Sequence, residues 1–362
     1  MTRLPARLES SRLTVRSIGR QVHGFCYAPG MKPLTTLALT VLLATATVLA
    51  QAQAPDRAQA QAAPAPPPNL IQQVRAVIND SGDLAKAEAV AAAYRTEKGI
   101  TPEYLEAFSW LGRGALGQQK LDQAEQYALQ AYDLCLDALK TRQMDDEPRL
   151  PIAIGAAIEV RAQVQAARGN RSEAVYFLRR EADTYGKTSI IQRINKNINL
   201  VSLEGEPAFE IASSEALAGT SPTLASLKGK PVVLFLWAHW CPDCKAMSPM
   251  LDELRTTYAS SGLTIVSPTQ RYGYVARRAP ATAEQELAYI KEIRQQSYPW
   301  MAENTVPVSS ELFLRYGVST TPTLVFINRD GTVKLYHPGQ MTKVEIEPVI
   351  KSLVAPAGSA RQ

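Results

Sequence analysis

Cys241 and Cys244 are separated by Pro242 and Asp243, a spacing that places the two cysteines one helical turn apart. They follow the apolar run Val232–Leu236, the pattern of a buried strand. Pro242 suits the first position of a helix, because its missing N–H would have no partner there. Cys241 is therefore expected at a helix N-terminus, where free N–H groups and the positive dipole end favour a thiolate. Cys244 is placed to attack a mixed disulfide formed on Cys241, so the pair predicts thiol–disulfide exchange.

Metal binding is the main competing chemistry for a close cysteine pair. A structural zinc site needs four ligands, and Cys241, Cys244 and His239 leave it short, with no second cluster in the chain. A copper site would need another soft ligand spaced to close around the two thiolates, and none is present. The pair therefore predicts redox chemistry with no metal and no cofactor.

Longer motifs surround the cysteines. Residues 237–245 (WAHWCPDCK) and 249–254 (PMLDEL) resemble the active-site strand and helix of the thioredoxin superfamily. Residues 317–327 (GVSTTPTLVFI) resemble its cis-proline segment, and the lead-in at 227–230 is closest to the exported TlpA/ResA-type branch. The resemblance covers about residues 203–353 and rests on two independent motifs in the right order.

The resemblance implies an α/β thioredoxin-like fold, a central mixed sheet flanked by helices. It implies that Trp240 shields the dithiol and that Thr321 and Pro322, joined by a cis peptide bond, form the substrate groove beside Cys241. An X–Pro bond adopts the cis form at a cost of only about 0.5–1 kcal/mol. The partners that it implies are protein disulfide substrates and a membrane or envelope electron donor.

The chain departs from the pattern at several positions. Most of this branch has proline directly before the second cysteine, where this chain has Asp243, and the buried acid of thioredoxin is replaced by Phe235. Asp243 either substitutes for that acid or only stabilises the helix dipole. A carboxylate near Cys241 disfavours its thiolate, which favours a reductase over a strong oxidase. His239 either tunes the thiol or points away along the end of the strand. A peroxidase of the same fold would need a lone activated cysteine with a threonine before it. Here Cys241 is one of a pair and follows His239 and Trp240, which argues against a peroxidase.

The periodicity of apolar residues predicts the elements of this domain. Strands are expected near 231–238, 263–268, 323–328 and 332–337, and helices near 242–259, 283–296, 309–316 and 342–353. Thr282 and Gln285 form a predicted capping box, and residues 328–331 (NRDG) a hairpin turn. The insertion at 269–300 contains Arg271-Tyr272-Gly273-Tyr274 and Arg277-Arg278. These residues either face the substrate or form a solvated loop, and we favour the loop.

Residues 69–202 show helical spacing almost throughout and predict an all-α domain of helical hairpins before the catalytic domain. Buried-type alanines at 87, 124 and 174 and the turn at 117–120 resemble a degenerate tetratricopeptide array. This domain either steadies the catalytic domain or docks a protein partner. An alternative function follows: an assembly adaptor in the cell envelope whose redox domain is secondary or inactive.

The N-terminal region reads as an export signal. Residues 1–54 are interpreted as an extension followed by a signal peptide that starts at Met31, and 55–68 as a low-complexity linker. We expect an exported protein of the periplasm or cell envelope, with a cleaved signal favoured over a retained membrane anchor. Cleavage would remove Cys26. The catalytic domain is expected at 203–354 and a disordered tail at 355–362.

Charge and the remaining cysteine complete the sequence picture. The six basic residues before residue 51 face a single acid, and removing them leaves equal numbers of basic and acidic residues. The chain therefore lacks the basic footprint of a nucleic-acid-binding protein. Cys135 stands alone on a predicted helix, where burial as a small apolar side chain is expected.

Overall fold

The computed structural model describes residues 67–355 except 212 and 303. The predicted signal peptide, its start at Met31, Cys26, the linker up to residue 66 and the tail from 356 lie outside the described residues. Within the part of the chain that is described, no helix is long and apolar enough to cross a membrane.

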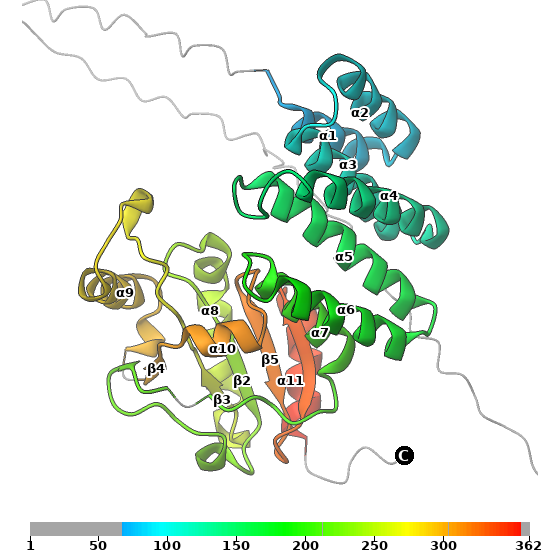
Figure 1. The fold of residues 1–362 in the computed structure, drawn as a ribbon. Coiled ribbons are helices and arrows are strands. Elements are labelled where there is room, and N and C mark those ends of the chain that lie inside the picture. Colours follow the sequence, from blue (N-terminus) through cyan, green and yellow to red (C-terminus); the bar gives the residue numbers. More distant parts are fainter. Residues whose placement is uncertain (1–66, 212, 303, 356–362) are drawn as a thin grey trace, which may run out of the picture. The chain divides into compact units, whose positions relative to one another are not determined.

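Seven helices come first (Figure 1). Their bounds are α1 Leu70–Ser81, α2 Leu84–Lys98, α3 Pro102–Gly117, α4 Leu121–Leu139, α5 Arg149–Ala167, α6 Arg171–Tyr185 and α7 Ile191–Ser202. Gly82 and Gly99 are the C-caps of α1 and α2. The hydroxyl of Thr101 accepts from the backbone of Tyr104 at the start of α3. The alanines at 87, 124 and 174 are fully buried between the helices.

An α/β domain follows, as predicted (Figure 1). Its strands are β1 Ala216–Leu217, β2 Val232–Leu236, β3 Thr264–Val266, β4 Val306–Pro307, β5 Thr323–Ile327 and β6 Val333–Pro338. Its α-helices are α8 Pro242–Thr257, α9 Ala283–Ser297, α10 Ser310–Arg315 and α11 Lys343–Val354. Four 3₁₀ turns accompany them: η1 Ala225–Leu227, η2 Ala259–Ser261, η3 Ala276–Arg278 and η4 Pro299–Met301. The eight predicted elements all form, and the β1–β4 ribbon is the addition.

The main sheet has the strand order β3-β2-β5-β6. β2 runs parallel to β3 and antiparallel to β5, which pairs antiparallel with β6, so the sheet is mixed as expected. The predicted hairpin turn joins β5 and β6, with the N–H of Asn328 donating to the carbonyl of Thr332. The capping box of Thr282 and Gln285 starts α9.

Alternation along the strands gives the sheet two buried faces. Val233 and Phe235 of β2 point into a core that α8, α9 and α11 complete. Leu234 and Leu236 point into the opposite core, which contains α10 residues and begins at Leu203. The core of the helical region ends at Val201. We therefore propose that residues 69–202 and 203–354 are the two domains, with α7 at the boundary.

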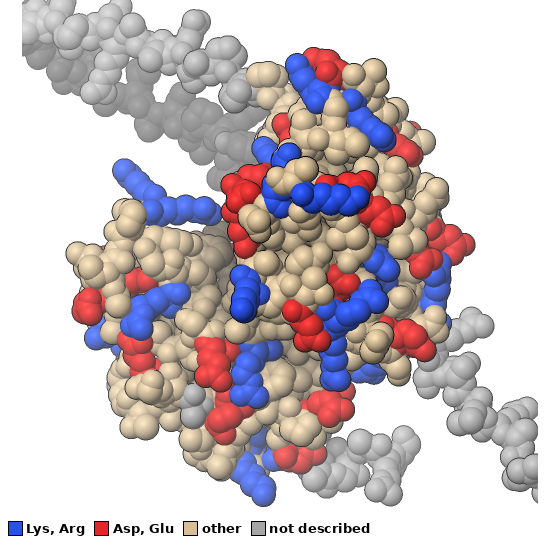
Figure 2. Space-filling model, in the orientation of Figure 1, with Lys and Arg blue, Asp and Glu red and all other residues tan. Residues whose placement is uncertain are grey.

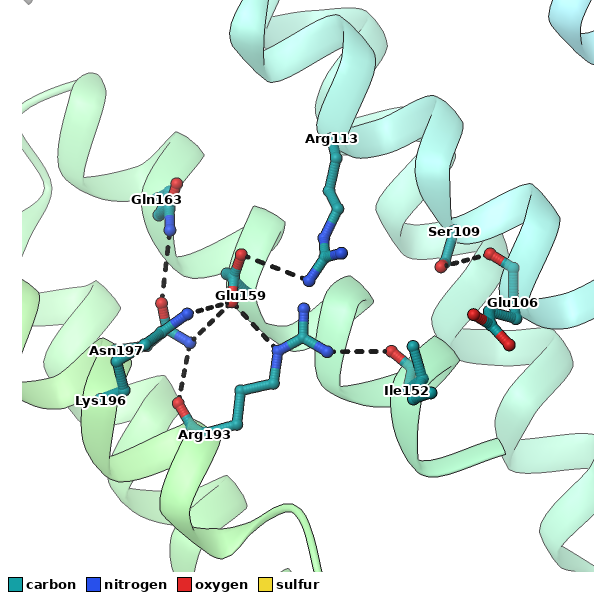
Figure 3. A network of polar contacts seen from close by, with 9 residues as sticks. All are labelled: Glu106, Ser109, Arg113, Ile152, Glu159, Gln163, Arg193, Lys196 and Asn197. Carbon is teal, nitrogen blue, oxygen red and sulfur yellow. Dashed lines mark hydrogen bonds and ion pairs between the residues drawn. The ribbon is translucent and has the colours of Figure 1, made fainter. Parts of the chain in front are cut away.

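A buried carboxylate joins α7 to the preceding helices (Figure 3). Glu159 of α5 accepts hydrogen bonds from Lys196 at 2.6 Å and Arg193 at 3.1 Å, and lies 3.7 Å from Arg113 of α3. Asn197 adds a bond at 3.3 Å. Burial alone would raise the pKa of Glu159, but the surrounding cations hold it below its ordinary value of 4.5. The carboxylate therefore stays charged and fixes α7 against the helical core.

Helix α7 also contacts the second domain, packing against α10 and β6. The side-chain amides of Asn195 and Asn199 donate to the carbonyls of Leu314 and Arg315, each at 2.9 Å. Elsewhere, positive and negative side chains are interspersed over the visible face (Figure 2). The helical region therefore meets the catalytic domain just before the cis-proline segment.

Candidate active site

The dithiol lies where the sequence predicts it. Cys241 is the N-cap of α8 and is joined to Cys244 by a disulfide, with their Cα atoms 5.3 Å apart. The backbone N–H of Cys244 donates to the Sγ atom of Cys241 at 3.0 Å. Pro242 occupies the first helical turn, and Asp243 beside it is exposed. Both cysteines are almost completely buried, so the residues that surround them control how a substrate gains access to them.

The cis-proline segment lies against the leading cysteine. The Thr321–Pro322 peptide bond is cis. The carbonyl oxygen of Thr321 lies 3.4 Å from the Sγ of Cys241, and the Thr321 hydroxyl is buried without a partner among the described residues. Trp240 stands beside the cysteines with 45% of its surface exposed. The structure thus brings Trp240, Cys241 and Cys244 together with Thr321 and Pro322, although more than 75 residues separate these two groups in the chain.

Trp237 fixes the end of the strand that leads to the dithiol. Its indole N–H donates to the carbonyl of Ser267 at 3.0 Å, and its own carbonyl accepts from the hydroxyl of Thr269 at 2.8 Å. Its ring packs against Tyr298 with centroids 4.7 Å apart. The turn that follows is closed by a hydrogen bond from the N–H of Cys241 to the carbonyl of Ala238.

His239 is fully buried and lies 3.1 Å from a carboxylate oxygen of Glu286 in α9. Its Nε2–H donates to Glu286, and its Nδ1 has no partner among the described residues. Burial lowers the pKa of His239 below 6.5, although Glu286 acts in the opposite direction. The ring is therefore mainly neutral at pH 7. It faces Glu286 of α9, and whether it tunes the thiol of Cys241 stays a prediction.

Glu286 was not predicted as a site residue. It is 1% exposed and also accepts the backbone N–H groups of Tyr272 at 2.6 Å and Gly273 at 2.8 Å. The sequence offers no signal for this role, because an acid in the first turn of a helix usually only interacts with the helix dipole. Glu286 holds the start of the insertion against the active-site turn through His239.

The insertion is only partly the solvated loop that the sequence suggested. Tyr272 packs edge-on against Trp240 with centroids 5.5 Å apart, and against His239 at 5.6 Å. Burial raises the pKa of the Tyr272 phenol, as expected for a ring that packs against other side chains and does not lie in open solvent. Arg277 and Arg278 are exposed as expected. The solvated-loop interpretation is therefore wrong for Tyr272 and Tyr274, whose rings pack against the buried His239, while Gly273 between them is exposed.

Phe235 lies fully buried beneath the site, in the position where thioredoxin has its acid. Asp243 is exposed in the first turn of α8, and its substitution for that acid stays a prediction.

Cys135 lies apart from the Cys241–Cys244 pair in the chain and is buried, as the sequence predicts. Burial raises the pKa of its thiol to about 12. Cys135 therefore takes no part in exchange at neutral pH.

Comparison with known proteins agrees with this geometry. Residues 220–353 match the family model of the thioredoxin-like domain. The chain is 28% identical over 137 residues to the thiol–disulfide oxidoreductase ResA of Bacillus thuringiensis subsp. konkukian, covering 38% of this chain and 71% of that one. It is 32% identical over 129 residues to the soluble secreted antigen MPT53 of Mycobacterium bovis, covering 34% and 65%.

Solved structures include similar proteins. A thiol:disulfide interchange protein DsbE from Chlorobium tepidum superposes with a TM-score of 0.33 and 24% identity, covering 42% of this chain and 98% of that one. Homologues of the domain include secreted proteins, as the name of MPT53 states. This chain therefore carries a thioredoxin-like domain, an oxidoreductase domain whose homologues are named thiol–disulfide oxidoreductases.

Proposed function

We propose that this protein is an exported thiol–disulfide oxidoreductase that works as a reductase on disulfides of envelope proteins. The observation that carries the proposal is the position of Cys241, at the N-terminus of α8 with its Sγ 3.4 Å from the carbonyl of Thr321. An extended substrate chain can pair with the backbone of Thr321 and thereby present its disulfide to Cys241. Trp240 and Tyr272 border this place.

The cycle begins with the reduced pair. The thiolate of Cys241 attacks a substrate disulfide, forms a mixed disulfide and releases one substrate thiolate. Cys244 then attacks the sulfur of Cys241, which closes the Cys241–Cys244 disulfide and releases the second substrate thiol. A donor in the membrane or envelope supplies two electrons and two protons to restore the dithiol. The disulfide in the structure is the state before this last step.

The direction of exchange follows from the charges near Cys241. A strong oxidase has a dithiol that is stabilised in its reduced form, commonly by a cation beside the thiolate. Here His239 is neutral and committed to Glu286, so it supplies no positive charge. The Cys244 N–H and the helix N-terminus still stabilise the thiolate, but without a positive charge from His239 the reduced form is stabilised less than in a strong oxidase, which favours a lower potential. We expect a value nearer about −270 mV than about −120 mV.

Insulin reduction tests the proposal. The wild type should reduce insulin with dithiothreitol as donor, and Cys241→Ser should abolish this activity. Cys244→Ser should instead accumulate mixed disulfides with envelope proteins, which non-reducing gels display. Cys135→Ser is the matched control and should retain full activity. Activity that is absent from the wild type, or unchanged in Cys241→Ser, would favour the envelope adaptor over the enzyme.

A further inference from the structure

A groove of about 590 Å³ lies beside the cis-proline segment. The helical region supplies one wall, from the connection between α4 and α5 and from the start of α7, and the catalytic domain supplies Ser319. The lining of the groove includes Asp145, Asp146, Glu147, Ile152, Arg193 and Ser319. Ser319 is exposed and precedes Thr321 by two residues, which span at most about 7 Å of extended chain. The groove therefore reaches to within two residues of Thr321, where the proposed substrate strand would pair.

The two walls are held together by direct contacts. Asn195 and Asn199 of α7 donate to carbonyls of α10, as described above. Gly317, at the start of the cis-proline segment, has φ 62° and lies so close to α7 that an added Cβ would overlap the backbone nitrogen of Lys196. The helical wall therefore has a fixed position relative to Thr321, and it is not a separate surface.

The helical wall carries fixed negative charge. Asp145 and Asp146 are exposed, and each carboxylate accepts a backbone N–H, from Ser189 and Gln143 respectively. Glu147 accepts two backbone N–H groups at the start of α5. These bonds orient the carboxylates without neutralising them, because each donor is an uncharged peptide group.

The cation of the lining does not cancel this charge. Arg193 donates through Nε to Glu159 at 3.1 Å and to the carbonyl of Ile152 at 3.1 Å. Among the residues that line the groove, Arg193 faces three carboxylates, those of Asp145, Asp146 and Glu147, so the lining keeps a net negative charge. Ile152 is 38% exposed and adds an apolar surface for the stem of a long side chain.

We propose that this groove binds the segment of a substrate protein that flanks its reacting cysteine, and that it favours segments rich in Lys or Arg. The proposal rests on the reductase function given above and names the kind of protein substrate. The acidic wall attracts the cationic heads, and the apolar residues contact the stems. The helical region thereby becomes part of the substrate site.

Two peptides test the charge preference by binding. Both carry a fluorescent label and a serine in place of the reacting cysteine; one has three flanking lysines and the other three glutamates. Wild-type protein should bind the lysine peptide at least about fivefold more tightly, as expected for two or three exposed charge pairs. In Asp145→Asn/Asp146→Asn the preference should fall below about twofold, since asparagine keeps the backbone acceptor but removes the charge. Equal affinity of the wild type for both peptides would overturn the proposal.

The matched control is Asp80→Asn/Asp133→Asn, which removes the same charge from exposed positions outside the groove. It should keep the wild-type preference, and an equal loss in both double variants would refute the groove. In a kinetic arm, Asp145→Asn/Asp146→Asn should raise KM for a lysine-flanked disulfide peptide, and Asp80→Asn/Asp133→Asn should leave that KM and the reduction of hydroxyethyl disulfide unchanged. If the wild type reduces neither disulfide, the reductase function fails. The fluorescence anisotropy of the two labelled peptides still decides whether the groove binds basic segments.

Discussion

Replacing Glu286 by alanine should destabilise the catalytic domain more than any exposed substitution on the same helix. The carboxylate is 1% exposed and accepts three hydrogen bonds, from His239, Tyr272 and Gly273. Gly273 is exposed, so its N–H can bond to water instead. The other two donors would be left without a partner, at about 1–3 kcal/mol each. We expect a loss of about 2–4 kcal/mol in the free energy of unfolding.

Urea unfolding followed by tryptophan fluorescence measures this loss. Glu284→Ala is the control, because Glu284 lies in the same first turn of α9 but is exposed. Its carboxylate interacts mainly with the helix start, through Thr282, its own backbone and the dipole. The control substitution should therefore cost less than about 1 kcal/mol. The Glu286 variant should also shift the emission of Trp240 in the native state, since Tyr272 would be released from its edge contact. A difference between the two variants below about 1 kcal/mol, with unchanged emission, would refute the positioning role of Glu286.

Three further predictions follow. Gly317→Ala should lower the free energy of unfolding by about 2–4 kcal/mol, because its Cβ would overlap Lys196 and its φ is positive; urea midpoints that match the wild type would contradict the contact. Glu159→Ala should cost about 3–5 kcal/mol by leaving buried cations unpaired. Since the pKa of Glu159 is lowered on folding, its contribution is complete above pH 4.5 and is lost as the pH falls through the folded value, which acid titration of the unfolding free energy measures. After reduction, iodoacetamide at pH 8 should alkylate Cys241 and leave Cys135 unmodified by mass spectrometry, because burial raises the pKa of Cys135 to about 12.

Much of the catalytic domain follows from local sequence pattern. The strand Val232–Leu236, the proline at the start of α8 and the Thr282–Gln285 capping box each depend on residues that are close in the chain. Such features are readable because strand alternation and helix caps act over two to four residues. The two motifs at 237–245 and 317–327 then identified which side chains meet around the dithiol.

The errors concern residues whose partners are distant. The sequence favours a solvated loop for Tyr272, because an inserted segment of this kind more often forms one. Its ring instead packs against Trp240, and its backbone N–H donates to the carboxylate of Glu286. His239 likewise depends on a carboxylate 47 residues away. An acid at a helix start looks the same in sequence whether it faces solvent or a buried imidazole.

The sequence by itself determined that a dithiol stands at the start of a helix and that a proline segment returns to it, since both are written in short runs of residues. Only the tertiary structure decided that α7 packs beside that segment, through Asn199 and Arg315, 116 residues apart. The physical reason is that a side-chain amide bonding to a distant carbonyl leaves no periodicity along the chain. Whether the helical region stands apart from the active site or borders it is therefore settled by packing alone.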